Sequence, residues 1–248
     1  MISITIVGRG NVATHFYKAM KDKGFEVKMI SSRDTFDEKD FTSDIIILAV
    51  KDMVIKEVMF RILQDLKGHL SDKQILVHTS GFMETSFLQS LCSNYGSFYP
   101  LQSLKKNTDI DFSCVSLCTW ANNTWTEKKL RTLALALSPL HYSFTDEQRK
   151  KIHLAAVFAN NFTNHLFYIS SNILKEANLN LETLYPLIDR TIEAIKEKKD
   201  PKYCQTGPAI REDYNIIKEH LSLLSPSLQE IYKLITQSII TTKQNETE

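Results

Sequence analysis

The chain has 248 residues, of which 43% are hydrophobic, and its 30 lysines and arginines nearly balance 29 aspartates and glutamates. This length can bury a substantial core and favours two domains, and the neutral balance argues against nucleic acid as the main partner. No apolar run approaches the roughly 20 residues of a membrane helix. The start lacks a secretory leader and the four cysteines are scattered. We therefore expect a cytoplasmic protein with reduced thiols, no membrane partner and no metal site.

The first thirteen residues carry the clearest motif. An apolar stretch at 2–7 runs directly into Gly8-Arg9-Gly10-Asn11-Val12-Ala13. A strand followed by Gly-x-Gly-x-x-Ala at the start of a helix is typical of dinucleotide-binding folds, although glycine pairs also occur in ordinary turns. The sequence thus predicts that Gly8, Gly10, Asn11 and Val12 hold a pyrophosphate at the N-terminus of the helix.

The residues up to 144 alternate between strand and helix patterns. Helical spacing of apolar residues predicts helices from Val12 to about Gly24, over 54–66 with Asp52 as its cap, and over 126–137. Strands are predicted at 25–30, 45–50, 74–77, 97–99 (stopped by Pro100), 115–119 and, at the sheet edge, 141–144. The run at 45–50 is β-branched throughout, as in strands buried on both faces of a parallel sheet. This order predicts an α/β fold with a doubly wound, mostly parallel sheet.

The end of the second predicted strand bears on the choice of cofactor. It reads Ile30-Ser31-Ser32-Arg33, with no carboxylate before Asp34. An acid at this place binds the ribose 2′-hydroxyl of NAD, whereas an arginine accepts the 2′-phosphate of NADP. Ser31, Ser32 and Arg33 therefore favour NADP(H) over NAD(H), unless they form an exposed polar loop.

Polar residues also follow the next two strands. Ligands in open α/β sheets bind outside the carboxyl ends of parallel strands. Val50 and Lys51, and then His78 and Thr79, are accordingly predicted to contact the cofactor. Ser80 is a catalytic candidate, and a helix-capping role for Thr79 or Ser80 is equally open.

From Thr145-Asp146, a good N-cap pair, the pattern becomes helical. Helices are predicted at 147–177, 181–198, 214–224 and 227–240, followed by a frayed polar tail at 241–248. We thus predict two domains, a sheet domain at 1–146 and an all-α domain at 147–240.

The first of these helices is unusually polar for a helix so rich in apolar residues. At α-helical spacing, His153, Asn160 and Asn164 share one narrow arc, with Asn161 on a neighbouring one. Buried amides need partners, so the set either forms an internal network or faces a ligand. His153 is the candidate proton donor because imidazole titrates near neutral pH, and Asn161 is the candidate holder of a substrate or carboxamide.

Three further residues are candidate substrate contacts. Asn160 shares the arc of His153, and Gln102 follows Pro100 at a predicted strand end. Arg211 could pair with a substrate carboxylate, although a structural ion pair is an equally open reading.

The motifs in combination resemble the family in which a Rossmann-like domain precedes a DUF2520 domain, related to pyrroline-5-carboxylate reductase and β-hydroxyacid-dehydrogenase-like NADP enzymes. The matching segments are Gly8 to Ala13, Leu48 to Asp52, His78 to Gly81, Phe98 to Ser103, His153 to Phe162 and Thr206 to Asp213. The family pattern has Thr where Ser103 stands and Gly where Glu212 stands. The resemblance implies a Rossmann-like domain followed by a helical one, and association through the long helices as a homodimer.

Two functions follow as hypotheses. The first is an NADP(H)-dependent oxidoreductase that transfers hydride to or from a small carbonyl or imine substrate between the two domains. The alternative is a non-catalytic NADP(H)-binding sensor or assembly module that dimerises through its helical domain.

Overall fold

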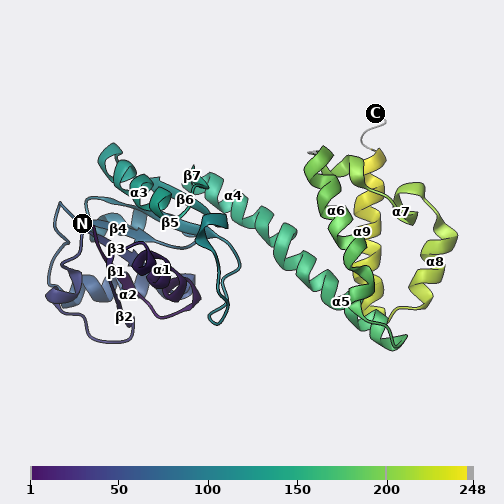
Figure 1. Ribbon diagram of the computed structural model, residues 1–248, viewed down its shortest axis with the longest axis horizontal. Helices are drawn as coiled ribbons and strands as arrows, with labels where there is room; N and C mark the ends of the chain where they lie inside the picture. Colours follow the sequence, from purple (N-terminus) through teal and green to yellow (C-terminus); the bar gives the residue numbers. More distant parts are fainter. Residues whose placement is uncertain (1, 199, 245–248) are drawn as a thin grey trace. The chain divides into compact units, whose positions relative to one another are not determined.

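The computed structural model describes residues 2–198 and 200–244. The chain divides into two compact units, Met1–His165 and Leu166–Glu248. This division falls inside the long helix, whereas we placed the domain boundary at its start. Figure 1 shows the elements of both units, coloured in chain order.

The first unit is built on a seven-stranded sheet with the order β2-β1-β3-β4-β5-β6-β7. Its strands are β1 (Ser3–Val7), β2 (Glu26–Ile30), β3 (Ile45–Leu48), β4 (Ile75–His78), β5 (Tyr95–Leu101), β6 (Ser116–Ala121) and β7 (His141–Ser143). All neighbouring pairs are parallel except β5 with β6. The predicted doubly wound, mostly parallel sheet is confirmed, and β7 lies at its edge as expected.

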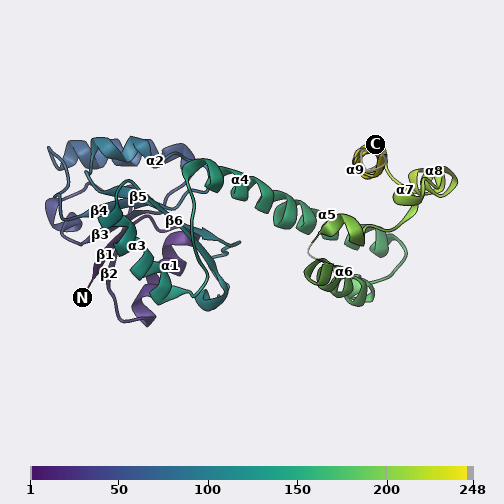
Figure 2. The ribbon, with the colours of Figure 1, turned by 90° about the horizontal axis from the view of Figure 1, so that it is seen from above.

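Helices cover both faces of the sheet. Figure 2 shows α2 (Asp52–Asp65) on one face and α1 (Asn11–Asp22) and α3 (Thr124–Leu137) on the other. One buried cluster lies under α1 and α3, and includes Phe16, Phe98 and Leu130. A second lies under α2 and includes Ile46 and Ile55. Short 3-10 turns complete the unit at Glu38–Phe41, Ser86–Ser90 and Phe112–Cys114.

The prediction that Pro100 stops its strand is wrong. β5 runs to Leu101, and Pro100 pairs with Leu117 of β6. β4 pairs with β5 only as far as Ser97, so Pro100 lies beyond the part of β5 that has neighbours on both sides. A proline is tolerated there because its missing N–H breaks no bond to β4.

The long predicted helix forms as one continuous helical run with an unpredicted change of geometry. It consists of α4 (Asp146–Ala156), a π-helical segment (Val157–Phe162) and α5 (Thr163–Glu176). Thr145 caps α4 through a capping box with Gln148, as the N-cap signal predicts.

The second unit is helical. After α5 it contains α6 (Tyr185–Lys198), α7 (Pro208–Arg211), α8 (Tyr214–Ser222) and α9 (Pro226–Gln244), with 3-10 turns at Leu181–Leu184 and Pro201–Cys204. The expectation of a frayed tail from 241 is wrong up to Gln244, where α9 continues, and 245–248 lie outside the described residues. Within the described part of the chain, no helix is both long enough and apolar enough to cross a membrane.

Candidate functional site

The turn after β1 has the geometry of a phosphate-binding loop. Gly8 has φ +128°, and a Cβ there would overlap the carbonyl oxygen of Ala49, so the close approach of this turn to the end of β3 requires glycine. Gly10 is the N-cap of α1 and makes no side-chain hydrogen bond, and nothing lies within 4 Å of where its Cβ would be. The first N–H groups of α1, beginning at Asn11 and Val12, are therefore available for an anion.

The loop after β2 is held by an arginine that the sequence analysis missed. Arg61 of α2 donates from Nη1 to the carbonyl of Ser32 (2.9 Å) and from Nη2 to the carbonyl of Asp34 (2.8 Å). Its guanidinium also lies 5.3 Å from the ring centroid of Phe36. Ser31 and Ser32 are half-buried and Arg33 is exposed, so Arg61 fixes the backbone and leaves Arg33 free to meet a ligand.

The residues at the ends of β3 and β4 are joined by a side-chain contact. Lys51 is the N-cap of α2, so the prediction of Asp52 as the cap is wrong. Asp52 instead accepts a hydrogen bond from the Ser80 hydroxyl (2.8 Å), because its place in the first turn leaves its carboxylate free to face the next loop. The Ser80 oxygen also accepts from the amides of Phe82 and Met83. These bonds order the loop after β4, and the catalytic role of Ser80 stays a prediction.

His78 and Thr79 are buried at this sheet edge, while Val50 is half-buried and Lys51 exposed. Burial, with the positive charge of Arg149, lowers the pKa of His78 to about 3. Its Nδ1 accepts from the amide of Ser80 (3.1 Å), and its ring stacks on Phe87. The His78 imidazole thus orders the loop from inside, and the cofactor contacts predicted for His78 and Thr79 stay predictions.

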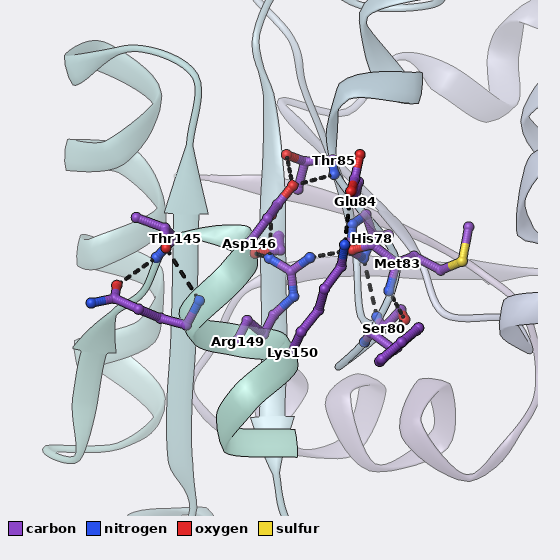
Figure 3. Close-up of polar contacts among 12 residues, drawn as sticks. His78, Ser80, Met83, Glu84, Thr85, Thr145, Asp146, Arg149 and Lys150 are labelled. Atoms are coloured by element: carbon purple, nitrogen blue, oxygen red, sulfur yellow. Dashed lines mark hydrogen bonds and ion pairs between the residues drawn. The ribbon is translucent and has the colours of Figure 1, made fainter. Parts of the chain in front are cut away.

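A buried arginine anchors the first turn of α4 to this loop, as Figure 3 shows. Arg149 is 1% exposed. It donates to the Ser97 hydroxyl (2.8 Å), to the Asp146 carboxylate (2.7 Å) and to the carbonyl of Met83. Asp146 also accepts from the amide (2.7 Å) and hydroxyl (3.0 Å) of Thr85. Strand β5, the loop after β4 and α4 are thereby held in one arrangement.

The charge state of this anchor follows from its contacts. Burial opposes ionisation of Asp146, but the Thr85 amide and Arg149 stabilise its anion and hold its pKa below the ordinary value. Asp146 is therefore charged at neutral pH, and Arg149 is a buried cation whose two terminal nitrogens are paired, while its Nε has no partner among the described residues.

One turn further along α4, His153 meets Tyr99 of β5. The Tyr99 hydroxyl lies 3.0 Å from His153 Nδ1, and the two rings pack edge to face with centroids 5.9 Å apart. Gly81 faces both: a Cβ there would lie 2.5 Å from His153 Nδ1 and 2.9 Å from Tyr99 Cζ. Only glycine lets the loop after β4 approach the pair this closely.

The π-helical segment brings a second polar side chain of the helix to the chain beyond β5. Asn160 donates to the Ser103 hydroxyl (2.6 Å), while the Gln102 amide oxygen accepts from the Ser103 amide (2.9 Å). Asn161 is exposed. The arc we predicted assumed unbroken α-helix, and the π-helical register replaces it after Ala156. The sequence left open whether these polar side chains form an internal network or face a ligand. His153 and Asn160 have internal partners, and the ligand roles of Asn160, Asn161 and Gln102 stay predictions.

Arg211 belongs to the second unit, at the end of α7. The nearby Asp213 caps α8 through the amide of Ile216, and the neighbouring Glu212 pairs with Lys243 at 2.8 Å. Glu212 has φ 55°, the left-handed conformation that glycine adopts at least cost, which agrees with the glycine of the family pattern. A substrate contact for Arg211 stays a prediction.

Three side chains of the site were not found from the sequence: Arg61, Tyr99 and Arg149. Arg149 precedes His153 by one helical turn, so the spacing could have placed both on one face of α4. Tyr99 lies at the strand end next to Pro100, within a motif that we quoted only for the resemblance. Arg61 left no local signal, because its partners lie 27 and 29 residues away.

Comparisons with known proteins identify a family and several similar solved structures. The family "Domain of unknown function (DUF2520)" matches residues 116–239. A structure from Bacteroides fragilis, described as a "putative NADP oxidoreductase", is 32% identical over 97% of this chain and 98% of its own, with a TM-score of 0.85. No protein of curated function matches.

More distant structures share the fold. Plasmodium falciparum pyrroline carboxylate reductase with NADP bound is 13% identical, with a TM-score of 0.60 over 98% of this chain and 100% of its own. An imine reductase from Myxococcus stipitatus in complex with NADP+ is 12% identical, also with a TM-score of 0.60, over 99% of this chain and 94% of its own. A variant of the latter was solved with NAD+. What this chain shares with these structures is the fold, a Rossmann-like domain followed by helices. Among the described residues, no group of histidine, cysteine and carboxylate side chains is arranged to hold a metal ion.

Proposed function

Because this chain belongs to the DUF2520 family, and because its β1–α1 turn is shaped for a pyrophosphate, we propose that it is an NADP(H)-dependent oxidoreductase acting on a small carbonyl or imine. The observation that carries the proposal is the glycine turn. Gly8 is required by the approach to Ala49, and the uncapped N-terminus of α1 offers free N–H groups beside it. The relative from Bacteroides fragilis, with its description as an NADP oxidoreductase, supports the same assignment.

Different residues of the first unit would bind different parts of the cofactor. Gly8, Gly10 and the amides of Asn11 and Val12 would hold the pyrophosphate, and Ser31, Ser32 and Arg33 would take the 2′-phosphate. Val50, Lys51 and the backbone at His78 and Thr79 line the carboxyl ends of β3 and β4, where the nicotinamide half would lie. The bound cofactor supplies or accepts a hydride there.

The preference for NADP(H) rests on Arg33, because relatives of this fold were solved with either cofactor. The guanidinium can form paired, charge-assisted hydrogen bonds to a phosphate, which the 2′-hydroxyl of NADH cannot accept in the same way.

Isothermal calorimetry with NADPH and NADH tests both parts of this proposal. We expect NADPH to bind more tightly, and Arg33→Ala to remove most of the difference. The matched control is Arg131→Ala, which removes an exposed arginine from α3 and should leave both affinities unchanged. If neither nucleotide binds the folded protein at millimolar concentration, the proposed function is wrong.

We also propose that two copies of the chain associate through the helical unit. The supporting observation is an apolar groove of about 300 Å³ between α5, α8 and α9. Its lining is Leu166, Ile169, Ile173, His220, Leu223, Leu224, Leu228, Ile231, Tyr232 and Ile235. A second copy is the favoured occupant because an isolated helical unit leaves this surface in water. The prediction that substrate binds between the domains stays a prediction.

The same exposed surface favours one alternative, a non-catalytic NADP(H)-binding assembly module. The two functions differ in turnover. Oxidation of NADPH in the presence of a carbonyl or imine, lost in His153→Ala, would exclude the alternative.

A further inference from the structure

We infer that Tyr99 and His153 form a proton relay, and that the substrate which this relay serves is a neutral carbonyl compound rather than an iminium ion. The inference rests on the proposed function, because a proton is needed only where hydride arrives. Tyr99 acts through His153 and is a positioning residue, whereas His153 is the group that would touch the substrate.

The pair lies at the right edge of the sheet. β4 and β5 are parallel, and Tyr99 lies near the carboxyl end of β5. Gly81 follows the carboxyl end of β4 by three residues, and a Cβ on it would overlap both side chains of the pair. Ligands of open α/β sheets bind outside this edge, so the pair adjoins the place expected for the nicotinamide half.

The phenol determines which imidazole nitrogen carries the proton. Burial raises the pKa of Tyr99 to about 12, so the hydroxyl keeps its proton at neutral pH. The charged and titratable groups that act on it are the Cys118 thiol from β6, Arg149 from α4 and Asp52 from α2. At 3.0 Å the neutral phenol can donate to Nδ1, and the proton of the neutral imidazole then lies on Nε2.

Nε2 is free to act on a ligand. Its ring partner Nδ1 is taken by Tyr99, and Nε2 has no hydrogen-bond partner within residues 2–198 and 200–244. The side chain is half-buried, so part of it is accessible. The arrangement therefore presents a single N–H donor from a fixed ring.

The need for a proton donor distinguishes a carbonyl substrate from an iminium ion. When hydride adds to a carbonyl carbon, the π electron pair of the C=O bond moves to oxygen, and the oxygen must gain a proton. Nε2 gives its proton to that oxygen while Nδ1 takes the phenol proton. A proton from solvent then returns to Nε2 and Nδ1 gives its proton back to the tyrosinate, so the net proton comes from solvent. An iminium ion becomes a neutral amine on hydride addition, so it needs no donor.

Steady-state kinetics of the full chain with NADPH test the relay. The probes are a 2-oxo acid, an aldehyde, a ketone and an N-methylated cyclic iminium ion, which carries its charge permanently and needs no proton donor. We expect turnover with a carbonyl probe. Tyr99→Phe should lower its kcat on the order of tenfold or more, change the pH profile of kcat, and leave the Kd for NADPH within about twofold. Tyr142→Phe, in an exposed tyrosine of edge strand β7, is the matched control and should match the wild type.

Nitrogen-15 NMR of His153 gives a second readout that requires no substrate. We expect the Nε2–H tautomer in the wild type and a mixture of tautomers in Tyr99→Phe. An Nδ1–H tautomer, or one that Tyr99→Phe does not alter, would overturn the relay.

The outcomes separate the relay from the proposed function. Carbonyl turnover that Tyr99→Phe leaves unchanged overturns the relay alone, and turnover confined to the iminium ion overturns the substrate class. Failure to bind NADPH overturns the proposed function instead, and the NMR result still decides the pairing of Tyr99 with His153.

Discussion

The two units of this chain bury their apolar residues to very different extents. In the first unit, apolar side chains form two buried clusters, one on each face of the sheet. In the described part of the second unit, only Ala209 and Ile240 are buried apolar residues, while Leu187, Leu223 and Leu234 are 65%, 80% and 71% exposed. The first unit therefore contains its own core, whereas the described part of the second leaves many of its apolar side chains exposed.

This difference in burial suggests different functions for the two units, namely chemistry in the first and assembly in the second. Burying a leucine side chain contributes about 1.5–3 kcal/mol, so several exposed leucines on one helical unit favour association strongly. The Gly8 turn and the Tyr99–His153 pair are both contained in the first unit. We infer that the first unit carries the chemistry and the second carries the assembly.

The largest change in stability is expected for Arg149→Met, which tests whether the first unit is self-contained. It removes a buried cation that holds α4, β5 and the loop after β4 together, and it leaves Asp146 without its partner. Breaking a buried ion pair costs about 3–5 kcal/mol, so we expect the free energy of unfolding to fall by that amount in urea titrations. Lys151→Met, an exposed change on the same helix, is the control. A loss below about 1 kcal/mol would contradict the anchoring role.

The second test addresses the association of the helical unit. Leu223→Asp places a charge in the apolar groove and should weaken dimerisation about a hundredfold, or roughly 2.8 kcal/mol. Light scattering after size exclusion measures the mass of each species as the protein is diluted. Gln64→Asp, which adds a charge to an exposed site of α2, should leave the dimer intact. A wild-type protein that is monomeric at all concentrations would contradict the assembly role.

His78 provides a test within the first unit alone. Its folded pKa of about 3 lies below the ordinary value of 6.5, so the unfolded chain takes up a proton that the folded chain does not. The stability is complete above pH 6.5 and is lost as the pH falls towards 3. Between pH 6.5 and 5 we expect a loss of roughly 2 kcal/mol in urea titrations.

Two variants identify the source of that loss. His78→Gln should flatten the pH dependence, and His69→Gln, which replaces an exposed histidine, should keep it. Asp146 contributes in a separate window, because its lowered pKa affects stability only near and below pH 4. An unchanged slope in His78→Gln would show that another group takes up the proton.

The smallest effect is expected at the start of α4. Thr145→Ala removes the hydroxyl that caps the amide of Gln148 and should cost about 1 kcal/mol. Differential scanning calorimetry can show whether this loss falls in the transition that Arg149→Met also lowers. Thr132→Ala, which removes an exposed hydroxyl from the interior of α3, should change stability by less than about 0.5 kcal/mol. A loss confined to a different transition would assign the start of α4 to the second unit.

Much of the first unit could be predicted from local patterns. β-branched runs identified β1 and β3, the glycine turn identified the start of α1, and Thr145 identified the start of α4. The end of β5 was missed because Pro100 is tolerated only through the pairing of its neighbours, and that pairing is a property of the whole sheet. The π-helical segment was missed because periodicity assumes a single helical geometry.

Some residues of the candidate site could likewise be predicted from local patterns, and others could not. Gly8 was identified from a short motif and His153 from helical spacing, whereas the partners that give them their roles come from elsewhere in the chain. Tyr99 is 54 residues from His153, and Arg149 meets residues 52 and 66 positions away. Such contacts depend on how the strands are ordered, which local spacing does not specify.

The burial of Arg149 has a consequence for cutting the chain into pieces. A fragment that ends at residue 146 would keep every strand, yet the Ser97 hydroxyl and the Met83 carbonyl would lose the guanidinium that binds them. The first turns of the long helix thus belong to the sheet as firmly as a strand does. A protease that cuts beyond His165 should release an intact piece, whereas a cut next to Arg149 should leave one that unfolds.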